Sequence, residues 1–278
     1  MKLDDVAYLV QMLRRRSGLV LTQPRAEVLE NRLAPVARRF GFRDVDSLVR
    51  ELRHGRDPLA RAVTEAMTTN ESSFFRDRAV FDQFAQKVLP ALLVQRAATR
   101  RLRIWSAACA AGQEPYSIAM LLDDHKLAAL GWTIDLIATD LNSEVVARAE
   151  QGLYSPFEVQ RGLPAHRLIA HFTAEGANWR VSETLRRMVT FRTFNLLDSF
   201  GWLDDLDVVF CRNVLMYFDH KSKVGVLDKI SEVLVPDGHL FLGPLETATG
   251  LSADFAPAAG APGVFVRARA SLPRAATA

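Results

Sequence analysis

Apolar residues in the first 66 positions of the chain recur at helical spacing and fall into four short blocks. The blocks are Leu3, Val6, Leu9, Val10 and Leu13; Val28, Leu29, Leu33 and Val36; Leu48, Val49 and Leu52; and Leu59, Ala62, Val63 and Met67. Gly18, Gly41 and Gly55 fall where the helices would end, and Asp44 and Asp57 fall where N-caps would lie. The pattern predicts a small all-helical domain over residues 1–66, without a catalytic cluster of its own.

The pattern changes in the segment Met67–Asp77, which is first polar, then aromatic, then charged. One interpretation is a linker whose polar residues cap the amphipathic helix predicted over Val80–Leu93. The other is a segment that folds back over a ligand, with Asn70 and Ser72 supplying hydrogen bonds and Arg76 a fixed positive charge. The periodicity does not decide between them.

A strand followed at once by small residues and a helix is predicted around residues 102–122. Leu102–Trp105 has strand character, and Pro115 suits a first helical turn. A second strand, Ile134–Thr139, leads into Asp140. In doubly wound folds an acidic residue at that place accepts hydrogen bonds from the ribose hydroxyls of a nucleoside. Any α/β protein can show such features, so the pattern alone is weak evidence.

The turn contains one glycine, Gly112, and lacks the G-x-G-x-x-G pattern of dinucleotide-binding proteins. With so few glycines the backbone cannot approach a pyrophosphate closely. A nucleoside without phosphates therefore fits better, and S-adenosylmethionine is such a ligand.

The rest of the chain alternates strands and helices, which predicts an α/β fold with a doubly wound, mostly parallel sheet over residues 91–268. The expected elements are a helix over 143–151, a strand leading into 193–198, a strand over 206–213, helices from about Val214 and over 223–235, and strands over 236–243 and 263–268, the last one antiparallel. Polar side chains follow several strand ends. We expect Asn195, Arg212, Asn213 and Tyr217 to converge with Asp140 at one edge of the sheet.

Residues of about 156–190 break this alternation, with Pro156, Gly162 and Pro164 interrupting the pattern. A short helix is expected at 167–172, and short strands at 179–181 and 188–191. This region is interpreted as a small inserted β-subdomain for partner binding or, equally, as a decorated crossover between strands. Residues 269–278 show no period and are expected to form a flexible tail.

Composition and charge limit the class of protein. Half of the residues, 49%, are hydrophobic, which suits a globular core. Cys109 and Cys211 are too few for a disulfide framework, lack a histidine placed to activate them, and are expected to be packing residues. No Cys/His cluster has metal-ligand spacing. With no apolar run of about 18 residues and no secretion signal, a cytoplasmic protein is expected.

The net positive charge is concentrated in the amino-terminal region of the chain. Residues 1–66 hold 13 Lys and Arg against 9 Asp and Glu, giving +4, while residues 67–278 hold 22 against 23, giving −1. A basic surface of this kind suits an acidic protein, nucleic acid or a membrane, and a solvated arginine-rich face is an equally ordinary explanation.

Taken together, these motifs resemble the CheR family of chemotaxis receptor methyltransferases, which use S-adenosylmethionine. The matching segments occur in the family's order: Thr69–Arg76 (TNESSFFR), Trp105–Ser117 (WSAACAAGQEPYS), Ala138–Asn142 (ATDLN), Asn195–Leu197 (NLL), Phe210–Asp219 (FCRNVLMYFD) and Leu234–Gly238 (LVPDG). The chain departs from the family pattern at Ala110, Ala111 and Gln113, where Ser, Thr and Glu are usual. The match to Glu114 is kept.

The resemblance implies a class I, Rossmann-like methyltransferase domain and a set of functional residues. Residues 67–90 would be the linker segment that contacts the cofactor. The residues implied to line the S-adenosylmethionine site are Asn70, Ser72, Arg76, Glu114, Asp140, Asn195, Leu196, Arg212 and Asn213. Tyr217 would lie beside the transferred methyl, and Arg76 and Tyr217 are the expected positioners of the incoming carboxylate.

The resemblance also implies the reaction and the partner. The family methylates glutamate side chains on the cytoplasmic helical bundle of chemoreceptors, giving methyl esters and S-adenosylhomocysteine. The basic all-helical domain over residues 1–66 would face that bundle. Because the turn at Ala174–Asn178 looks short, we expect the protein to work without a receptor carboxy-terminal pentapeptide. A monomer without metal, nucleic-acid partner or membrane insertion is expected.

Two other classes of function share parts of this pattern. An adaptor that kept the fold and lost the chemistry, or a methyltransferase acting on another protein, would keep the cleft. Nucleic-acid methyltransferases that act on exocyclic amines usually carry Asp/Asn-Pro-Pro-Tyr/Phe after the fourth strand. Here that place holds Arg212, Asn213, Val214 and Leu215, which disfavours that class.

Overall fold

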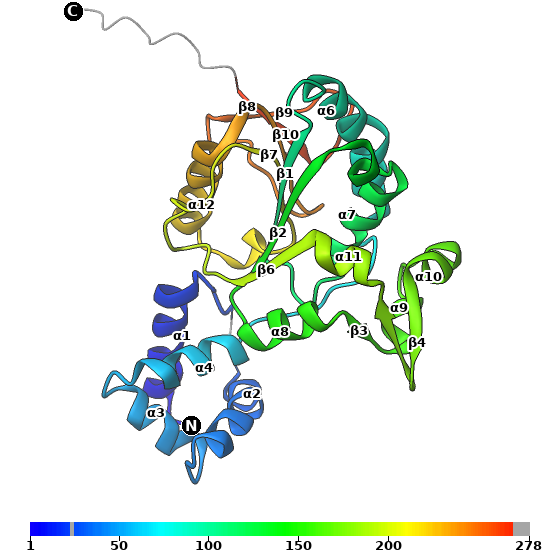
Figure 1. Cartoon of the computed structure of the whole chain (residues 1–278). Coiled ribbons are helices and arrows are strands. Elements are labelled where there is room, and N and C mark those ends of the chain that lie inside the picture. Colours follow the sequence, from blue (N-terminus) through cyan, green and yellow to red (C-terminus); the bar gives the residue numbers. More distant parts are fainter. Residues whose placement is uncertain (23–24, 269–278) are drawn as a thin grey trace, which may run out of the picture.

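The computed structural model describes residues 1–22 and 25–268 of the chain, so the expected tail at 269–278 lies outside the described residues. Figure 1 shows a bundle of amino-terminal helices below a larger body in which helices flank a central sheet. Within the described residues, no helix combines the length and the apolar character needed to cross a membrane.

The four predicted amino-terminal helices are confirmed as α1 (Leu3–Ser17), α2 (Ala26–Arg39), α3 (Val45–Leu52) and α4 (Asp57–Ala66). Their apolar faces meet in a core of their own, in which Leu9, Leu33 and Leu48 are fully buried. The predicted N-cap at Asp44 is confirmed, because its side chain accepts a hydrogen bond from the Ser47 amide. The one at Asp57 is wrong.

Asp57 is the first residue of α4, after Arg56, and it makes no capping hydrogen bond. Its carboxylate instead forms an ion pair with Arg16, 2.6 Å away. The ion pair with a neighbouring helix takes the place of the local cap that the sequence indicated.

A seven-stranded sheet forms the larger body, and its strand order is β6-β2-β1-β7-β8-β10-β9. The strands are β1 (Arg101–Ala107), β2 (Thr133–Asp140), β6 (Val189–Thr193), β7 (Leu206–Cys211), β8 (Leu234–Phe241), β9 (Phe255–Pro257) and β10 (Val264–Arg267). The first five strands in this order are parallel, and β10 and β9 add antiparallel strands at one edge. The predicted doubly wound, mostly parallel sheet is confirmed; β9 was not predicted.

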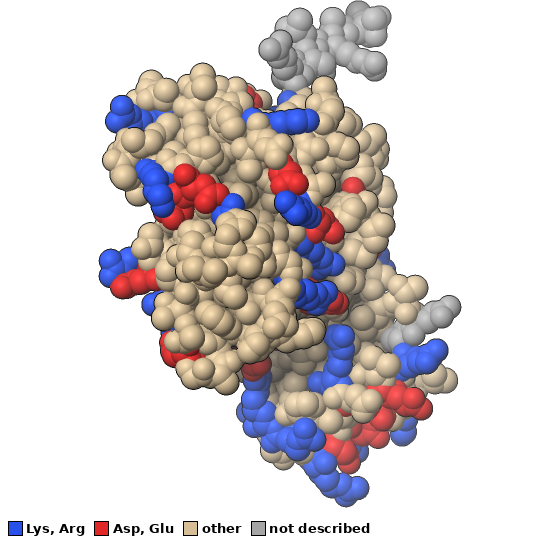
Figure 2. Space-filling model, turned by 90° about the vertical axis from the view of Figure 1, so that its right-hand side faces the viewer, with Lys and Arg blue, Asp and Glu red and all other residues tan. Residues whose placement is uncertain are grey.

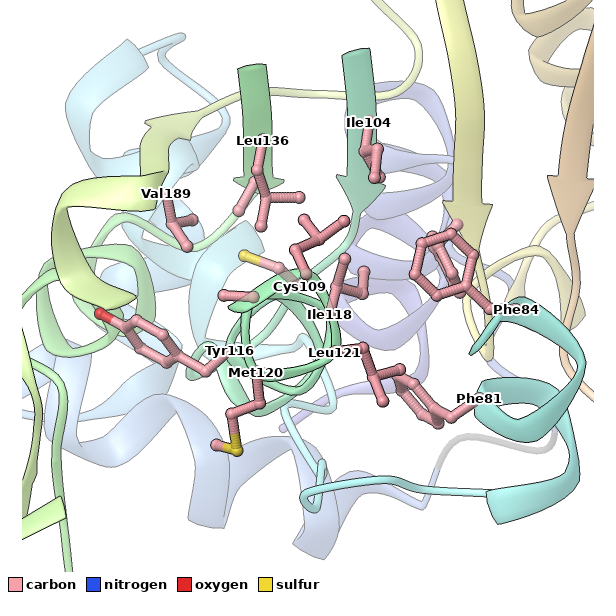
Figure 3. Packing of buried hydrophobic residues seen from close by; sticks show 14 of the residues in the cluster. Phe81, Phe84, Ile104, Cys109, Tyr116, Ile118, Met120, Leu121, Leu136 and Val189 are labelled. Carbon is pink, nitrogen blue, oxygen red and sulfur yellow. The ribbon is translucent and has the colours of Figure 1, made fainter. Parts of the chain in front are cut away.

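Successive residues of the central strands bury their side chains on opposite faces, as the strand period requires. Ile104 and Leu136 pack on one face against α7 (Gln113–Asp124) and against the helix of α5 (Arg78–Gln83), a π turn (Phe84–Val88) and α6 (Leu89–Gln95). Figure 3 shows this packing around α7. Trp105 and Ile137 point to the other face, which α12 (His220–Val233) covers.

The helix predicted from about Val214 is wrong. The segment forms a single 3-10 turn, Leu215–Tyr217, and α12 begins only at His220, capped by the Asp219 side chain. Asn213, which precedes this turn, has a left-handed backbone with φ of 59°, and its amide donates to a side chain from elsewhere in the chain. The helix predicted over 223–235 corresponds to α12, and residues 234–235 belong to β8.

The insertion between β2 and β6 holds α8 (Ser143–Gln151), α9 (Pro156–Gln160), α10 (Ala165–His171) and α11 (Glu183–Met188) around a three-stranded antiparallel sheet. Its strands are β3 (Leu153–Tyr154), β4 (Phe172–Glu175) and β5 (Asn178–Val181), in the order β3-β5-β4. The strand expected at 188–191 as part of this insertion lies instead in the main sheet, as β6 beside β2. The sequence did not predict α9, α11, β3 and β4.

Candidate functional site

All ten residues singled out by sequence line one cleft at the carboxyl ends of β1, β2 and β7. The cleft encloses about 950 Å³, counting the part that is open to solvent. The ten are Asn70, Ser72, Arg76, Glu114, Asp140, Asn195, Leu196, Arg212, Asn213 and Tyr217. The structure therefore brings together residues that follow the strands β1, β2, β6 and β7 and residues of Met67–Asp77, which we call the connecting segment, as the expected convergence requires.

The turn between β1 and α7 forms the floor of the cleft with an unusual backbone. Ala108, Ala110 and Gly112 all have left-handed conformations, with φ of 57°, 49° and 91°. Such conformations are strained for residues with a side chain and cluster at functional sites. At Gly112 a Cβ atom would lie 2.8 Å from the Cβ of Ala149. Glycine is needed there so that α8 can pack against the turn.

Asp140 ends β2 and lies beside that turn. Its carboxylate oxygens accept hydrogen bonds from the Ala110 and Asn142 backbone amides, each at 2.9 Å. Burial raises the pKa of the Asp140 carboxyl, and the backbone donors oppose that shift. The amides fix the direction of the carboxylate at the cleft wall, where further hydroxyl donors can reach it.

Glu114 and Arg212 form a buried ion pair under the cleft. Arg212 Nη1 lies 2.8 Å from Glu114 Oε2, and Arg212 Nη2 lies 2.7 Å from Asp77 Oδ2 and 2.8 Å from the Arg76 carbonyl oxygen. Glu114 also accepts from the Ser106 hydroxyl. Burial raises the pKa of Glu114, and Arg212 acts against that shift. Among the described residues, the buried Nε of Arg212 has no partner.

The connecting segment lies across the cleft and carries Asn70, Ser72 and Arg76, which are half-buried. Arg76 Nη1 donates to the Glu71 carbonyl oxygen at 2.9 Å. Phe74 points away from the cleft and is fully buried between Tyr154 and Phe172. The interpretation that polar residues of this segment cap the next helix is wrong, because α5 begins after Asp77 without a side-chain cap. The polar residues line the cleft instead, and their contact with a ligand stays a prediction.

The inserted subdomain supports the same segment from behind. Arg161 forms an ion pair with Glu71, at 2.5 Å between Nη2 and Oε1. Gly162 packs so closely that a Cβ atom there would lie 2.1 Å from the Phe74 carbonyl oxygen. Arg167 lies over the Phe75 ring, 5.1 Å from its centroid. The insertion is therefore part of the scaffold of the cleft.

The helical domain also contributes to the cleft, which the sequence did not predict. Ser17 and Leu19, at and after the end of α1, are among its lining residues. Leu19 pairs with Phe218 in an isolated antiparallel bridge, and the Val20 amide donates to the Tyr217 carbonyl oxygen at 2.8 Å. No local pattern marks such a contact, because its partners are far apart in the sequence.

Asn195 lines the cleft and also contacts the helical domain. Its Nδ2 donates to the Arg16 carbonyl oxygen at 2.6 Å, and its Oδ1 accepts from the Leu197 amide at 3.0 Å. The amide therefore joins the helical domain to the cleft wall. Cys109 and Cys211 are buried, and burial raises both thiol pKa values well above the usual range, so the prediction that they are packing residues is confirmed.

The part of the chain that the structure describes contains no cluster of metal-ligating side chains. No group of three or more His, Cys, Asp or Glu side chains there has the arrangement of a metal site. The polar groups of the cleft are carboxylates, an arginine and backbone amides, which suit an organic ligand with hydroxyl and charged groups.

The parallel sheet, the acidic residue at the end of its second strand and the cleft without a phosphate-binding glycine pair fit the Rossmann-like class of S-adenosylmethionine-dependent methyltransferases, and a family model shows this class. The model of the CheR methyltransferase all-alpha domain matches residues 4–68, and that of the CheR methyltransferase SAM binding domain matches residues 70–263. The chain belongs to the CheR methyltransferase family. The predicted family and cofactor are thereby confirmed.

Relatives of nearly the same length have similar sequences. Chemotaxis protein methyltransferase 1 of Pseudomonas aeruginosa is 38% identical over 92% of this chain and 95% of its own length. Chemotaxis protein methyltransferase Cher2 of Pseudomonas putida is 36% identical over the same shares. Chemotaxis protein methyltransferase of Vibrio parahaemolyticus is 34% identical over 92% of this chain and 94% of its own length. The similarity covers both domains.

Proposed function

We propose that the protein transfers the methyl group of S-adenosylmethionine to glutamate side-chain carboxylates of chemoreceptors, giving glutamate methyl esters and S-adenosylhomocysteine. One observation carries the proposal: a cation, Arg76, and a hydroxyl, Tyr217, line the same cleft as the buried acid Asp140. The names of the relatives, which are chemotaxis protein methyltransferases, support the receptor as substrate.

The residues of the cleft fit this cofactor. The carboxylate of Asp140 is held by two backbone amides and has room to accept hydrogen bonds from ribose hydroxyls. The buried Nε of Arg212 lacks a partner in the described chain and suits the carboxylate of an amino acid group. The small residues Ala108 and Ala110 leave space at the strand end.

The bound cofactor would supply a methyl group activated by a positively charged sulfur. Asp140 would hold the ribose and Arg212 the amino acid part, while Arg76 and Tyr217 orient the incoming carboxylate. A glutamate with a pKa near about 4.3 is already ionised at neutral pH, so no residue need act as a general base. The chain accelerates the reaction by alignment and by excluding water, which favours a step that cancels charge.

The helical domain is the proposed receptor-facing part. Lys and Arg side chains gather at the lower end of the molecule in Figure 2, where this domain lies, with acidic side chains among them. Its net charge of +4, from 13 Lys and Arg against 9 Asp and Glu over residues 1–66, suits an acidic helical bundle. Ser17 and Leu19 place the end of α1 at the cleft, so a receptor on this domain lies close to the methyl donor.

We also propose that the protein acts as a cytoplasmic monomer and without a receptor pentapeptide. The turn between β4 and β5 has only two residues, since Glu175 pairs with Asn178. This short hairpin supports independence from the tether. Calorimetric titration with carboxy-terminal receptor pentapeptides should give no binding heat, and clear heat would contradict the proposal. The domain division at residues 1–66, 67–90 and 91–268 is part of the same proposal.

The experiment that tests the reaction uses S-adenosylmethionine with a labelled methyl group and cytoplasmic domains of candidate receptors. Label should enter the receptor and be released as methanol by mild base, as expected for an ester. Mass spectrometry then maps the modified glutamates. Label that is stable to base, or absent although calorimetry shows cofactor binding, would contradict glutamate methylation. An Asp140→Asn variant serves as the control with weakened cofactor binding.

A further inference from the structure

Glu246, in the loop after β8, accepts hydrogen bonds from four backbone amides at once. Its Oε2 lies 2.8 Å from the Asn213 nitrogen and 2.7 Å from the Gly243 nitrogen. Its Oε1 lies 2.8 Å from the Val214 nitrogen and 3.1 Å from the Met216 nitrogen. Three of these donors belong to one short segment, residues 213–217, which we call the β7 exit loop.

The β7 exit loop has little regular structure to hold it. It begins with the left-handed Asn213, with φ of 59°, and makes one 3-10 turn. Consecutive amides in such a turn converge and form a concave site for an anion. In this protein the anion is a side chain of the chain itself. The carboxylate therefore takes over amides that neither a helix nor a strand would satisfy.

The surroundings of Glu246 are shaped for this contact. At Gly243 a Cβ atom would lie 2.7 Å from Glu246 Oε2 and 2.8 Å from Asn213 Nδ2. Any side chain there would push the carboxylate and the loop apart. At the other end of the loop's sequence, the Val20 amide donates to the Tyr217 carbonyl oxygen. The loop is thus held between the helical domain and Glu246.

Asn213, Val214 and Tyr217 of this loop line the cleft, whereas Glu246 does not. From this geometry we propose that Glu246 is a positioning residue, which fixes the β7 exit loop and thereby sets the place of the Tyr217 hydroxyl during methyl transfer. The effect on transfer rests on the proposed function. The effect on the loop does not, so the two can be tested apart.

The sharpest probe is Glu246→Gln, which keeps the size of the side chain. An amide offers one acceptor oxygen, and its NH₂ group would face two backbone N–H donors, so the loop loses about half of its support. Hydrogen exchange of peptides covering residues 212–219 should show protection in the wild type and faster exchange in the variant. This readout needs neither cofactor nor receptor.

For methyl transfer, a displacement of the loop should lower kcat by about tenfold or more, as expected for a misplaced positioning group. The Kd for S-adenosylhomocysteine, measured by calorimetry, should change by a smaller factor than kcat, because Asp140 and Arg212 remain in place and only Asn213 moves with the loop. Glu246→Asp, which keeps the carboxylate, should recover part of kcat. The control is Glu232→Gln, an identical chemical change at an exposed site on α12, which should leave all readouts unchanged.

Three results would overturn the proposal. One is a folded Glu246→Gln variant with wild-type exchange and kcat within about twofold of normal. Another is an equal loss of kcat and cofactor affinity, which would show that the substitution disturbs the cofactor-binding site. The third applies even if the variant does not fold: fast hydrogen exchange of the amides in residues 213–216 of the wild-type protein would exclude their hydrogen bonds with Glu246. Absence of methyl transfer by the wild type would refute the proposed function and leave the exchange test valid.

Discussion

The two sides of the cleft are built in different ways. The sheet side, formed by Glu114, Asp140 and Arg212, is buried, with exposed fractions of 9%, 7% and 5%. Each of these side chains makes at least two hydrogen bonds inside the protein. The outer side includes Arg76 and Tyr217, which are half-buried. Within the described residues, Arg76 donates only to a backbone carbonyl, and the Tyr217 hydroxyl makes no hydrogen bond.

The difference corresponds to two tasks. A cofactor has the same shape in every turnover, so the groups that hold it gain from being fixed before it binds. A protein substrate has to bring a long glutamate side chain into the cleft, and the groups that receive it need freedom to adjust. Substitutions on the sheet side should therefore damage both folding and cofactor binding, while those on the outer side should mainly reduce turnover.

The largest effect is expected from Arg212→Met. The substitution leaves Glu114 buried without its cation, and breaking a buried ion pair in this way destabilises a protein by about 3 to 5 kcal/mol. Binding of S-adenosylhomocysteine should fall below detection. Urea unfolding and calorimetry measure the two effects. Arg43→Met is the matched control, because the Arg43 side chain is 93% exposed, and it should change stability by less than about 0.5 kcal/mol. Equal losses of stability and affinity in the two variants would show that the buried ion pair contributes no more than the exposed Arg43.

A smaller loss is expected when the support behind the connecting segment is disturbed. Gly162→Ala places a methyl group against the Phe74 carbonyl oxygen, 2.1 Å away, in a residue with φ of +88°. The backbone has to move, and overpacking together with the strained conformation should lower the free energy of unfolding by about 2 to 4 kcal/mol. The affinity for S-adenosylhomocysteine should also fall, because Asn70 and Ser72 move with the segment.

Gly176→Ala is the comparison for this prediction. Gly176 lies in the turn between β4 and β5 with φ of +60°, and a Cβ atom added there would have no neighbour within 4 Å. It shares the backbone strain but not the collision, so it should lower stability by only about 1 kcal/mol and leave affinity unchanged. If both variants behaved alike, the contact between the insertion and the connecting segment would have no role.

The same contrast explains what the sequence could predict. Asp140 was identified because it directly follows a predicted strand, and a parallel sheet brings the ends of its strands together. The four amino-terminal helices followed from periodicity of Leu and Val. The residue pattern left two interpretations open for Asn70 and Arg76, and the resemblance to a family favoured one of them and supplied Glu114 and Leu196.

Contacts made through the backbone or between distant segments could not be predicted. Glu246 binds amides, which every residue carries, so no pattern of side chains reveals it. The segment expected to be a helix near Val214 is a single 3-10 turn, and its Met216 amide donates to the same carboxylate, a contact that no sequence pattern shows. Leu19 meets Phe218 only in the folded chain. Strands of two to four residues, such as β3 and β4, are too short to show a period.

On the outer side, Arg76→Gln should mainly affect turnover. Loss of the charge that orients the incoming carboxylate should lower kcat by about 10- to 100-fold, while the Kd for S-adenosylhomocysteine changes by less than about threefold. Initial rates at saturating cofactor, together with calorimetry, measure both. Arg76→Lys keeps the charge and should recover part of the rate. Equal losses of rate and affinity in Arg76→Gln would show that Arg76 holds the cofactor instead.

The smallest effect concerns the link between the two domains at Asp219. This residue caps α12 through the Ser222 amide and pairs with Arg14 of α1, 2.6 Å away, and these two contacts lower the pKa of its carboxyl from 3.8 to about 2. A carboxyl with a lowered pKa stabilises the fold when ionised, so its contribution is complete above about pH 4 and is lost as the pH falls toward 2. Because the pair is near the surface, that contribution should be below about 1 kcal/mol.

Asp219→Asn tests this contribution, since asparagine still caps a helix but carries no charge. The difference in the free energy of unfolding between wild type and variant, measured in urea at several pH values, should be constant from pH 7 to about pH 5. It should then shrink toward zero as the pH approaches 2, because the wild-type carboxyl becomes neutral. A difference that does not change with pH would mean that the helix cap, which asparagine keeps only in part, accounts for it. The ion pair with Arg14 would then add nothing to the attachment of the helical domain.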